Sequence, residues 1–238
     1  MKLDILVFAA HPDDVELSCS GTIIKNIQSG KNVGIIDLTR GELGTRGTPE
    51  IRNAESALAS KIMGVSVREN LEFPDVFFKD TMEAQLEIAK RIRQYQPEIV
   101  LANAIQDRHP DHGRASQLVS EACFLAGLVK INTSLNGAEQ KSWRPKAVYH
   151  YIQDRYIKPD FVVDISDVFE QKMKAILAYS SQFYNPESKE PDTAISSSEF
   201  IEFLKGRANN YARDIGARYA EGFTVERVIG VKNLFDLL

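Results

Sequence analysis

The chain has 238 residues, of which 43% are hydrophobic, and a formal net charge of -4 at pH 7. This size and apolar content suit one large globular domain and exclude an intrinsically disordered chain. The acidic balance argues against nucleic-acid binding, and no apolar run approaches the roughly 18 residues of a membrane span.

The first half of the chain alternates predicted strands and helices. Short apolar runs predict strands at residues 2–10, 31–38, 69–73 and 98–102. Helical periodicity predicts helices over residues 19–29, 49–63, 80–95 and 112–128. This alternation predicts an α/β fold, a Rossmann-like and mainly parallel sheet with helices on both faces.

The second half is less regular. It contains predicted strands at residues 147–152 and 161–164 and predicted helices over residues 168–179 and 200–215. The polar stretch 132–143 is expected to form a surface loop over the site. We expect a single domain over residues 1–238, with a core of about 1–150 and a C-terminal elaboration of about 151–238.

Two polar clusters follow predicted strands, and they contain His11, Asp13, Asp14, His109, Asp111 and His112. Because the carboxyl ends of parallel strands share one edge of a sheet, the two clusters can converge there. Three of the chain's four histidines lie in them. Two histidines and an aspartate make a catalytic zinc set that leaves a fourth position for water. The Asp13–Asp14 pair taken alone is equally consistent with capping of the next helix.

Other features indicate ordinary structure or a supporting role. The glycine-rich loop at residues 39–49 is long for a strand–helix connection, so it is expected to contribute to the site. His150 lies within a predicted strand and is expected to be a packed, hydrogen-bonded residue. Cys19 and Cys123 are expected to be buried free thiols, which favours a cytoplasmic location.

The segments Ala10-His11-Pro12-Asp13-Asp14-Val15-Glu16 and His109-Pro110-Asp111-His112 carry a family resemblance. Together they resemble the AHPDDxE and HxDH motifs of the zinc-dependent PIG-L or LmbE-like de-N-acetylases. The segments 39–42, 44–47, 181–184 and 219–223 further resemble the bacillithiol-pathway branch, the N-acetylglucosaminyl-malate deacetylases. On this basis the resemblance covers nearly the whole chain.

The resemblance implies one Zn²⁺ ion per chain, held by His11, Asp14 and His112; other divalent metals suit the same ligands. It implies that Asp13 is the general base. It implies that His109, when protonated, polarises the substrate carbonyl or stabilises the oxyanion. Asp111 would orient His109 through a carboxylate–imidazole hydrogen bond.

The implied reaction is hydrolysis of the acetamide of N-acetyl-glucosaminyl L-malate, a small acetylated amino sugar, with release of acetate. Arginines beside the site suit the malate carboxylate, with Arg52 and Arg108 as first choices and Arg46 as a third. Tyr184 and Tyr219 are candidate donors to the sugar or the oxyanion. For each of these side chains, ordinary ion pairing or packing remains an open alternative.

Other functions remain open. The main alternative is deacetylation of another N-acetylglucosamine derivative or of a chito-oligosaccharide. A non-catalytic Rossmann-like binding module and a two-metal phosphoesterase are weaker alternatives, and the chain is short of carboxylates for two ions. No nucleic-acid or membrane partner is expected, and formation of a homo-oligomer is left open.

Overall fold

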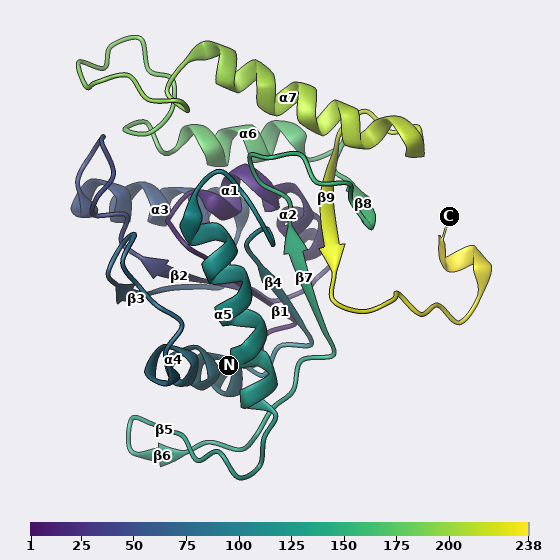
Figure 1. The fold of residues 1–238 in the computed structure, drawn as a ribbon. Coiled ribbons are helices and arrows are strands. Elements are labelled where there is room, and N and C mark those ends of the chain that lie inside the picture. The colour runs from purple at the N-terminus through teal and green to yellow at the C-terminus, as the bar shows by residue number, and fades with distance from the viewer. Residues whose placement is uncertain (238) are drawn as a thin grey trace.

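One mixed sheet forms the centre of the protein (Figure 1). The computed structural model describes residues 1 to 237, and within them seven strands form this sheet in the order β3-β2-β1-β4-β7-β9-β8. Five strands run parallel: β1 Ile5–Ala9, β2 Val33–Thr39, β3 Val67–Phe73, β4 Ile99–Ala102 and β7 Ala147–Tyr151. The strand β9 Ala220–Val225 pairs antiparallel with both β7 and β8 Phe161–Asp164. This arrangement confirms the predicted α/β class and the mainly parallel sheet.

Helices cover both faces of the sheet (Figure 1). One face packs against α4 Met82–Tyr95 and α5 Pro110–Ala126. The other side holds α1 Asp14–Ser18, α2 Ser20–Gln28, α3 Pro49–Met63, α6 Phe169–Leu177 and α7 Ser198–Ala212. Strand β1 is buried on both faces: Leu6 and Phe8 join the first core, and Ile5 and Val7 the second. A central parallel strand is therefore a continuous apolar run, as its sequence indicates.

The observed elements differ from the predicted ones at three places. The helix expected over residues 19–29 is preceded by a separate short helix, α1, which begins at Asp14. The strand β9 was not expected. The 132–143 segment forms the hairpin of β5 Ser134–Leu135 and β6 Ala138–Glu139.

That hairpin segment does not cover the site, so the expectation for it is wrong. The indole of Trp143 donates to the carbonyl of Pro97 at 2.7 Å, just before β4 begins, and Gln140 donates to the carbonyl of Lys90 on α4. These contacts attach the segment near the amino end of β4. The polar clusters follow the carboxyl ends of the strands instead.

Short 3₁₀ turns complete the chain at η1 Arg213–Ile215 and η2 Leu234–Leu237. Within residues 1 to 237, no helix combines the length and the apolar character needed to cross a bilayer.

Candidate active site

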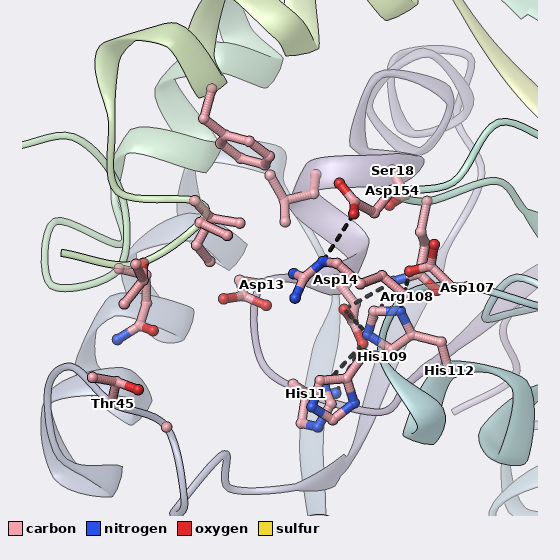
Figure 2. A pocket seen from close by; sticks show the side chains of 18 of the residues that line it. His11, Asp13, Asp14, Ser18, Thr45, Asp107, Arg108, His109, His112 and Asp154 are labelled. Carbon is pink, nitrogen blue, oxygen red and sulfur yellow. Dashed lines mark hydrogen bonds and ion pairs between the residues drawn. The ribbon is translucent and has the colours of Figure 1, made fainter.

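The two polar clusters meet at the carboxyl edge of the sheet, as predicted (Figure 2). Strands β1 and β4 are hydrogen-bonded neighbours, so the segments that follow them start side by side. Asp14 Oδ1 lies 3.1 Å from Nε2 of His112, and the rings of His11 and His109 are 4.6 Å apart between centroids. Residues about a hundred positions apart in sequence therefore form one cluster.

Neighbouring Asp13 and Asp14 direct their carboxylates to different partners. Asp13 has a φ of 114°, a left-handed backbone that non-glycine residues rarely adopt and that stores strain. Its Oδ2 accepts a hydrogen bond from Nη2 of Arg52 at 2.8 Å. Asp13 stands at the N-cap of α1 but makes no side-chain cap hydrogen bond. The capping alternative for Asp13 is thus not realised.

The carboxylate of Asp14 is buried among donors. It accepts hydrogen bonds from the main-chain N–H of His11 at 2.9 Å, from Asn103 at 3.0 Å and from Gln153 at 2.9 Å. Burial alone would raise its pKa, but the nearby charge of His112 and the hydrogen bonds of both histidines hold the pKa well below its usual value. Asp14 therefore stays ionised, as a metal ligand must.

The distances around Asp14 suit a divalent cation. Two ligand atoms bound to one tetrahedral zinc at the usual bond lengths lie about 3.3 Å apart. Asp14 Oδ1 lies 3.1 Å from His112 Nε2, and the other carboxylate oxygen, Oδ2, lies 3.6 Å from His11 Nδ1. Ligand atoms of His11, His109 and His112 also fall within 4.8 Å of one another, as do those of His11, Asp75 and Asp111. The residues present fit a metal centre with His11 as its common member.

Two carboxylates contact the imidazole of His112, one at each ring nitrogen. Its Nδ1 lies 2.6 Å from Asp107 Oδ2, while its Nε2 faces Asp14. Burial lowers the pKa of His112, but Asp14 and Asp107 outweigh it and raise the pKa to about 9. A metal ion must displace this proton to bind at Nε2, since only the neutral imidazole is a ligand.

Asp75 is a site residue that the sequence analysis missed. Its Oδ1 lies 3.0 Å from Nε2 of His11, and Asp111 Oδ2 lies 3.4 Å from the same nitrogen. Asp75 follows β3, so it reaches the same sheet edge as the two clusters. The carboxyl ends of parallel strands share one edge of the sheet, and applying this rule to β3 as well would have predicted Asp75 at the site.

The expected hydrogen bond between the Asp111 carboxylate and His109 is wrong. The carboxylate instead accepts from the main-chain N–H of Val76 at 2.9 Å and pairs with Arg114. The main-chain N–H of Asp111, in the first turn of α5, donates to Nδ1 of His109 at 3.3 Å. This follows from the free N–H groups at a helix start, which take the nearest acceptor.

The same contact indicates which nitrogen of His109 carries the proton. An acceptor Nδ1 leaves the proton of the neutral ring on Nε2. Burial, together with the charges of His11 and His112, lowers the pKa of His109 below its usual value. Both observations favour a neutral His109 that donates through Nε2 over the protonated ring that the resemblance implied.

A cavity of about 240 Å³ opens onto the cluster (Figure 2). Its walls include Leu43, Gly44, Thr45 and Arg46, so the 39–49 loop contributes to the site as expected. The C-terminal part of the chain supplies Gln153, Asp154, Gln182, the stretch 193–195, Phe200, Leu204 and Arg207. The site is polar around the histidines and partly apolar on the side of α7.

Of the five predicted substrate-binding residues, the structure places three at the cavity and two away from it. Arg46, Arg52 and Arg108 line the cavity. Arg52 is already paired with Asp13, and Arg108 with Asp154 at 2.9 Å. Tyr184 and Tyr219 do not belong to the cavity wall. Tyr219 stacks on Phe169 with centroids 3.7 Å apart, and Tyr184 is about half exposed.

The expectations for His150 and for the two cysteines are confirmed. The ring of His150 is buried between Ser116 Oγ, at 2.8 Å, and Glu226 Oε1, at 3.1 Å. Cys19 and Cys123 are buried free thiols.

Comparison with known proteins gives a consistent set of likenesses. A family model described as PIG-L, GlcNAc-PI de-N-acetylase, matches residues 6–123. A diacetylchitobiose deacetylase of Thermococcus kodakarensis is 34% identical over 92% of this chain and 81% of its own length. A probable N-acetyl-α-D-glucosaminyl L-malate deacetylase of Bacillus cereus is 29% identical over 76% of this chain and 84% of its own length. A solved structure of a conserved protein from Thermus thermophilus superposes with a TM-score of 0.84 at 39% identity, covering 97% of this chain and 98% of the other.

Proposed function

The chain belongs to the PIG-L family of carbohydrate de-N-acetylases, and on that premise we propose that it removes the acetyl group from an N-acetylglucosamine derivative with the help of one bound metal ion. The observation that carries this proposal is the convergence of His11, Asp14 and His112 beside a carboxylate, Asp13, that is paired with Arg52. This arrangement offers three ligands and a separate base at the end of one cavity.

The ligands in the proposal are His11, Asp14 and His112, and zinc is the proposed ion. When bound, the ion would supply a Lewis acid for the acetyl oxygen and make a water molecule more acidic. Asp13 would take the proton of the attacking water and pass it to the leaving amine. The Nε2–H of His109 would donate to the developing oxyanion.

The substrate is proposed at the level of an N-acetylglucosamine derivative, which includes chito-oligosaccharides. The higher identity with a diacetylchitobiose deacetylase than with a malate deacetylase supports this choice over the malate conjugate. The pairing of Arg52 and Arg108 with aspartates also removes the main support for a malate carboxylate at those positions. A cytoplasmic location is part of the proposal and is supported by the two free thiols.

The test is release of acetate from purified protein. N-acetylglucosamine, N,N'-diacetylchitobiose and N-acetylglucosaminyl malate are each incubated with the protein and followed by mass spectrometry, with and without a chelator. We expect deacetylation that the chelator abolishes and added zinc restores. Asp13→Asn should abolish turnover, whereas Asp167→Asn, at an exposed ion pair, should leave it unchanged. Retained turnover in metal-depleted protein would contradict the proposal.

A further inference from the structure

Each histidine of the proposed ligand set has one ring nitrogen that faces Asp14 and one that faces another carboxylate. His112 directs Nε2 to Asp14 at 3.1 Å and Nδ1 to Asp107 Oδ2 at 2.6 Å. His11 directs Nδ1 to Asp14 at 3.6 Å and Nε2 to Asp75 Oδ1 at 3.0 Å. The two rings therefore present different nitrogens to Asp14. A ring nitrogen binds a metal ion only when it carries no proton, so the carboxylate behind each ring bears on which nitrogen can be the ligand.

Asp107 has one oxygen available for His112. Its Oδ1 accepts a hydrogen bond from the main-chain N–H of Arg155 at 2.7 Å, which leaves Oδ2 for Nδ1 of His112. An ionised carboxylate can only accept, so Nδ1 of the neutral ring carries the proton. The side-chain amide nitrogen of Gln153, a donor, lies 3.4 Å from Nε2 of the same ring. Both contacts leave Nε2 unprotonated toward Asp14.

Asp75 is arranged in the same way behind His11. Its Oδ2 accepts a hydrogen bond from the main-chain N–H of Leu43 at 3.0 Å, and its Oδ1 faces Nε2 of His11. Oδ2 of Asp111 lies 3.4 Å from the same nitrogen and is a second acceptor there. Two acceptors favour a proton on Nε2 of the neutral ring. Nδ1 of His11 is then unprotonated toward Asp14.

We propose that Asp75 and Asp107 are positioning residues that fix opposite tautomers in the two histidine ligands. His11 then binds the metal ion through Nδ1, and His112 binds it through Nε2. The proposal rests on the proposed function, which names these two histidines as ligands. A carboxylate that accepts from the second nitrogen of a ligand histidine fixes the orientation of the ring and makes it a stronger ligand.

Asp107→Asn tests the tautomer of His112. The single oxygen of the new amide is held by the N–H of Arg155, so its NH₂ group faces Nδ1. Nδ1 must then accept, which moves the ring proton to Nε2 and blocks the ligand nitrogen. Asp107→Ala removes the acceptor without imposing the wrong tautomer. We expect zinc affinity to fall by about tenfold in Asp107→Ala and by about a hundredfold in Asp107→Asn.

Zinc affinity is measured by competition with a chromophoric chelator, and urea denaturation of each metal-free variant measures its folding stability. A merely structural role would make the isosteric Asp107→Asn the milder change, so a larger loss of zinc affinity in Asp107→Ala would overturn the proposal. The matched control is Asp160→Asn. Asp160 also accepts from a main-chain N–H, at 2.9 Å, but it lies at the surface just before β8, so zinc affinity should stay at the wild-type value.

The role of Asp75 is tested in the same assay. Asp75→Asn should lower zinc affinity, but by less than Asp107→Asn, because Asp111 remains as an acceptor at Nε2 of His11. Unchanged zinc affinity in Asp75→Asn would overturn the assignment of Asp75.

A measurement on the unaltered protein identifies the ligand nitrogens. Long-range proton–nitrogen NMR spectra of the zinc-loaded protein, with isotope-labelled histidine, distinguish the protonated from the metal-bound nitrogen of each ring. We expect zinc on Nδ1 of His11 and on Nε2 of His112. Zinc on Nε2 of His11 would overturn the proposal and make Asp75 and Asp111 ligands, a grouping that the distances between them also allow.

These readouts do not depend on turnover, so the proposal and the proposed function fail separately. Zinc on the expected nitrogens in a protein that releases no acetate would support the positioning roles and overturn deacetylation. Acetate release together with equal zinc affinity in Asp107→Asn and the wild-type protein would overturn the positioning roles and support deacetylation. If Asp107→Asn does not fold, the spectra of the wild-type protein decide.

Discussion

Asp13 combines several features that suit its proposed role as the general base. Its left-handed backbone turns it away from Asp14, and Arg52 holds its carboxylate at 2.8 Å. Burial raises the pKa of Asp13 to about 7, against the opposing effect of the Arg52 charge. A base is most effective when its pKa lies near the working pH, because it is then both ionised and able to accept a proton.

Replacing Arg52 tests whether its charge offsets the effect of burial on the pKa of Asp13. In Arg52→Gln the positive charge that lowers the pKa of Asp13 is gone, so that pKa should rise. Since only the ionised form accepts a proton, the acid limb of kcat/KM should move to higher pH, and activity at pH 7 should fall. The measurement is a pH–rate profile at saturating metal for variant and wild type. A variant whose acid limb stays in place would show that Arg52 does not tune Asp13.

His109 allows a second test at the scale of one residue. As a neutral Nε2–H donor it would stabilise the oxyanion without holding the metal. His109→Ala should therefore keep its metal content and lose about a hundredfold in kcat, the typical effect of removing one oxyanion donor. Metal analysis and steady-state kinetics on the same sample measure the retained metal and the loss in kcat. Loss of metal in proportion to activity would make His109 a ligand instead, which the grouping of His11, His109 and His112 also allows.

At the scale of elements, α1 depends on the C-terminal part of the chain. It is five residues long and begins at Asp14, too short to be stable alone. Lys172 on α6 donates to the carbonyls of Glu16 and Leu17 at its end, at 3.1 and 3.0 Å. Lys172 also pairs with Glu221 on β9 at 2.7 Å, and Glu221 accepts from two N–H groups at the start of α2.

Breaking this buried pair should destabilise the protein strongly. Lys172→Met removes the cation that pairs with the buried Glu221 carboxylate and leaves it only the two N–H donors of α2, and breaking a buried pair in this way costs about 3–5 kcal/mol. The matched control is Lys25→Met, which breaks a largely exposed pair with Asp167 and should cost about 0–1 kcal/mol. Urea unfolding followed by circular dichroism measures both. Similar losses in the free energy of unfolding of the two variants would mean that the buried pair does not stabilise α1.

The elements that local sequence determines were predictable, and those set by distant contacts were not. The 49–63 helix has its bounds as predicted because Thr48 caps it, Pro49 opens it and Gly64, with a φ of 83°, ends it. Strand β9 was missed because Glu221 and Gly222 interrupt its apolar pattern. Its place in the sheet comes from pairing with β7 and β8, which no local pattern records.

The same distinction holds for the candidate site. The motifs around His11 and His112 predicted the cluster, because two parallel strands place them at one edge. The partners of Arg52 and Arg108 were not predictable, since each ion pair joins segments about forty or more positions apart. Tyr219 was expected at the site, but its ring packs on Phe169 of α6 instead.

At the scale of the whole molecule, the C-terminal region completes both the sheet and the cavity. Strand β9 lies between β7 and β8, so its removal would separate β8 from the rest of the sheet. Phe200, Leu204 and Arg207 of α7 form part of the cavity wall. We therefore propose that residues 1–238 fold as one unit, and that the boundary near residue 150 separates no independently stable core.

Two truncations test this proposal. Ending the chain after Arg227 removes a segment in which Val228, Leu234 and Phe235 are 77% to 91% exposed, so stability and metal binding should stay within error of the full chain. Ending it after Ala217 also removes β9 and with it the Glu221 partner of Lys172. That protein should lose cooperative unfolding and zinc binding, as measured by urea denaturation and calorimetric titration. A chain of residues 1–217 that still unfolds cooperatively and binds zinc would show that β9 is an addition to a core already stable without it.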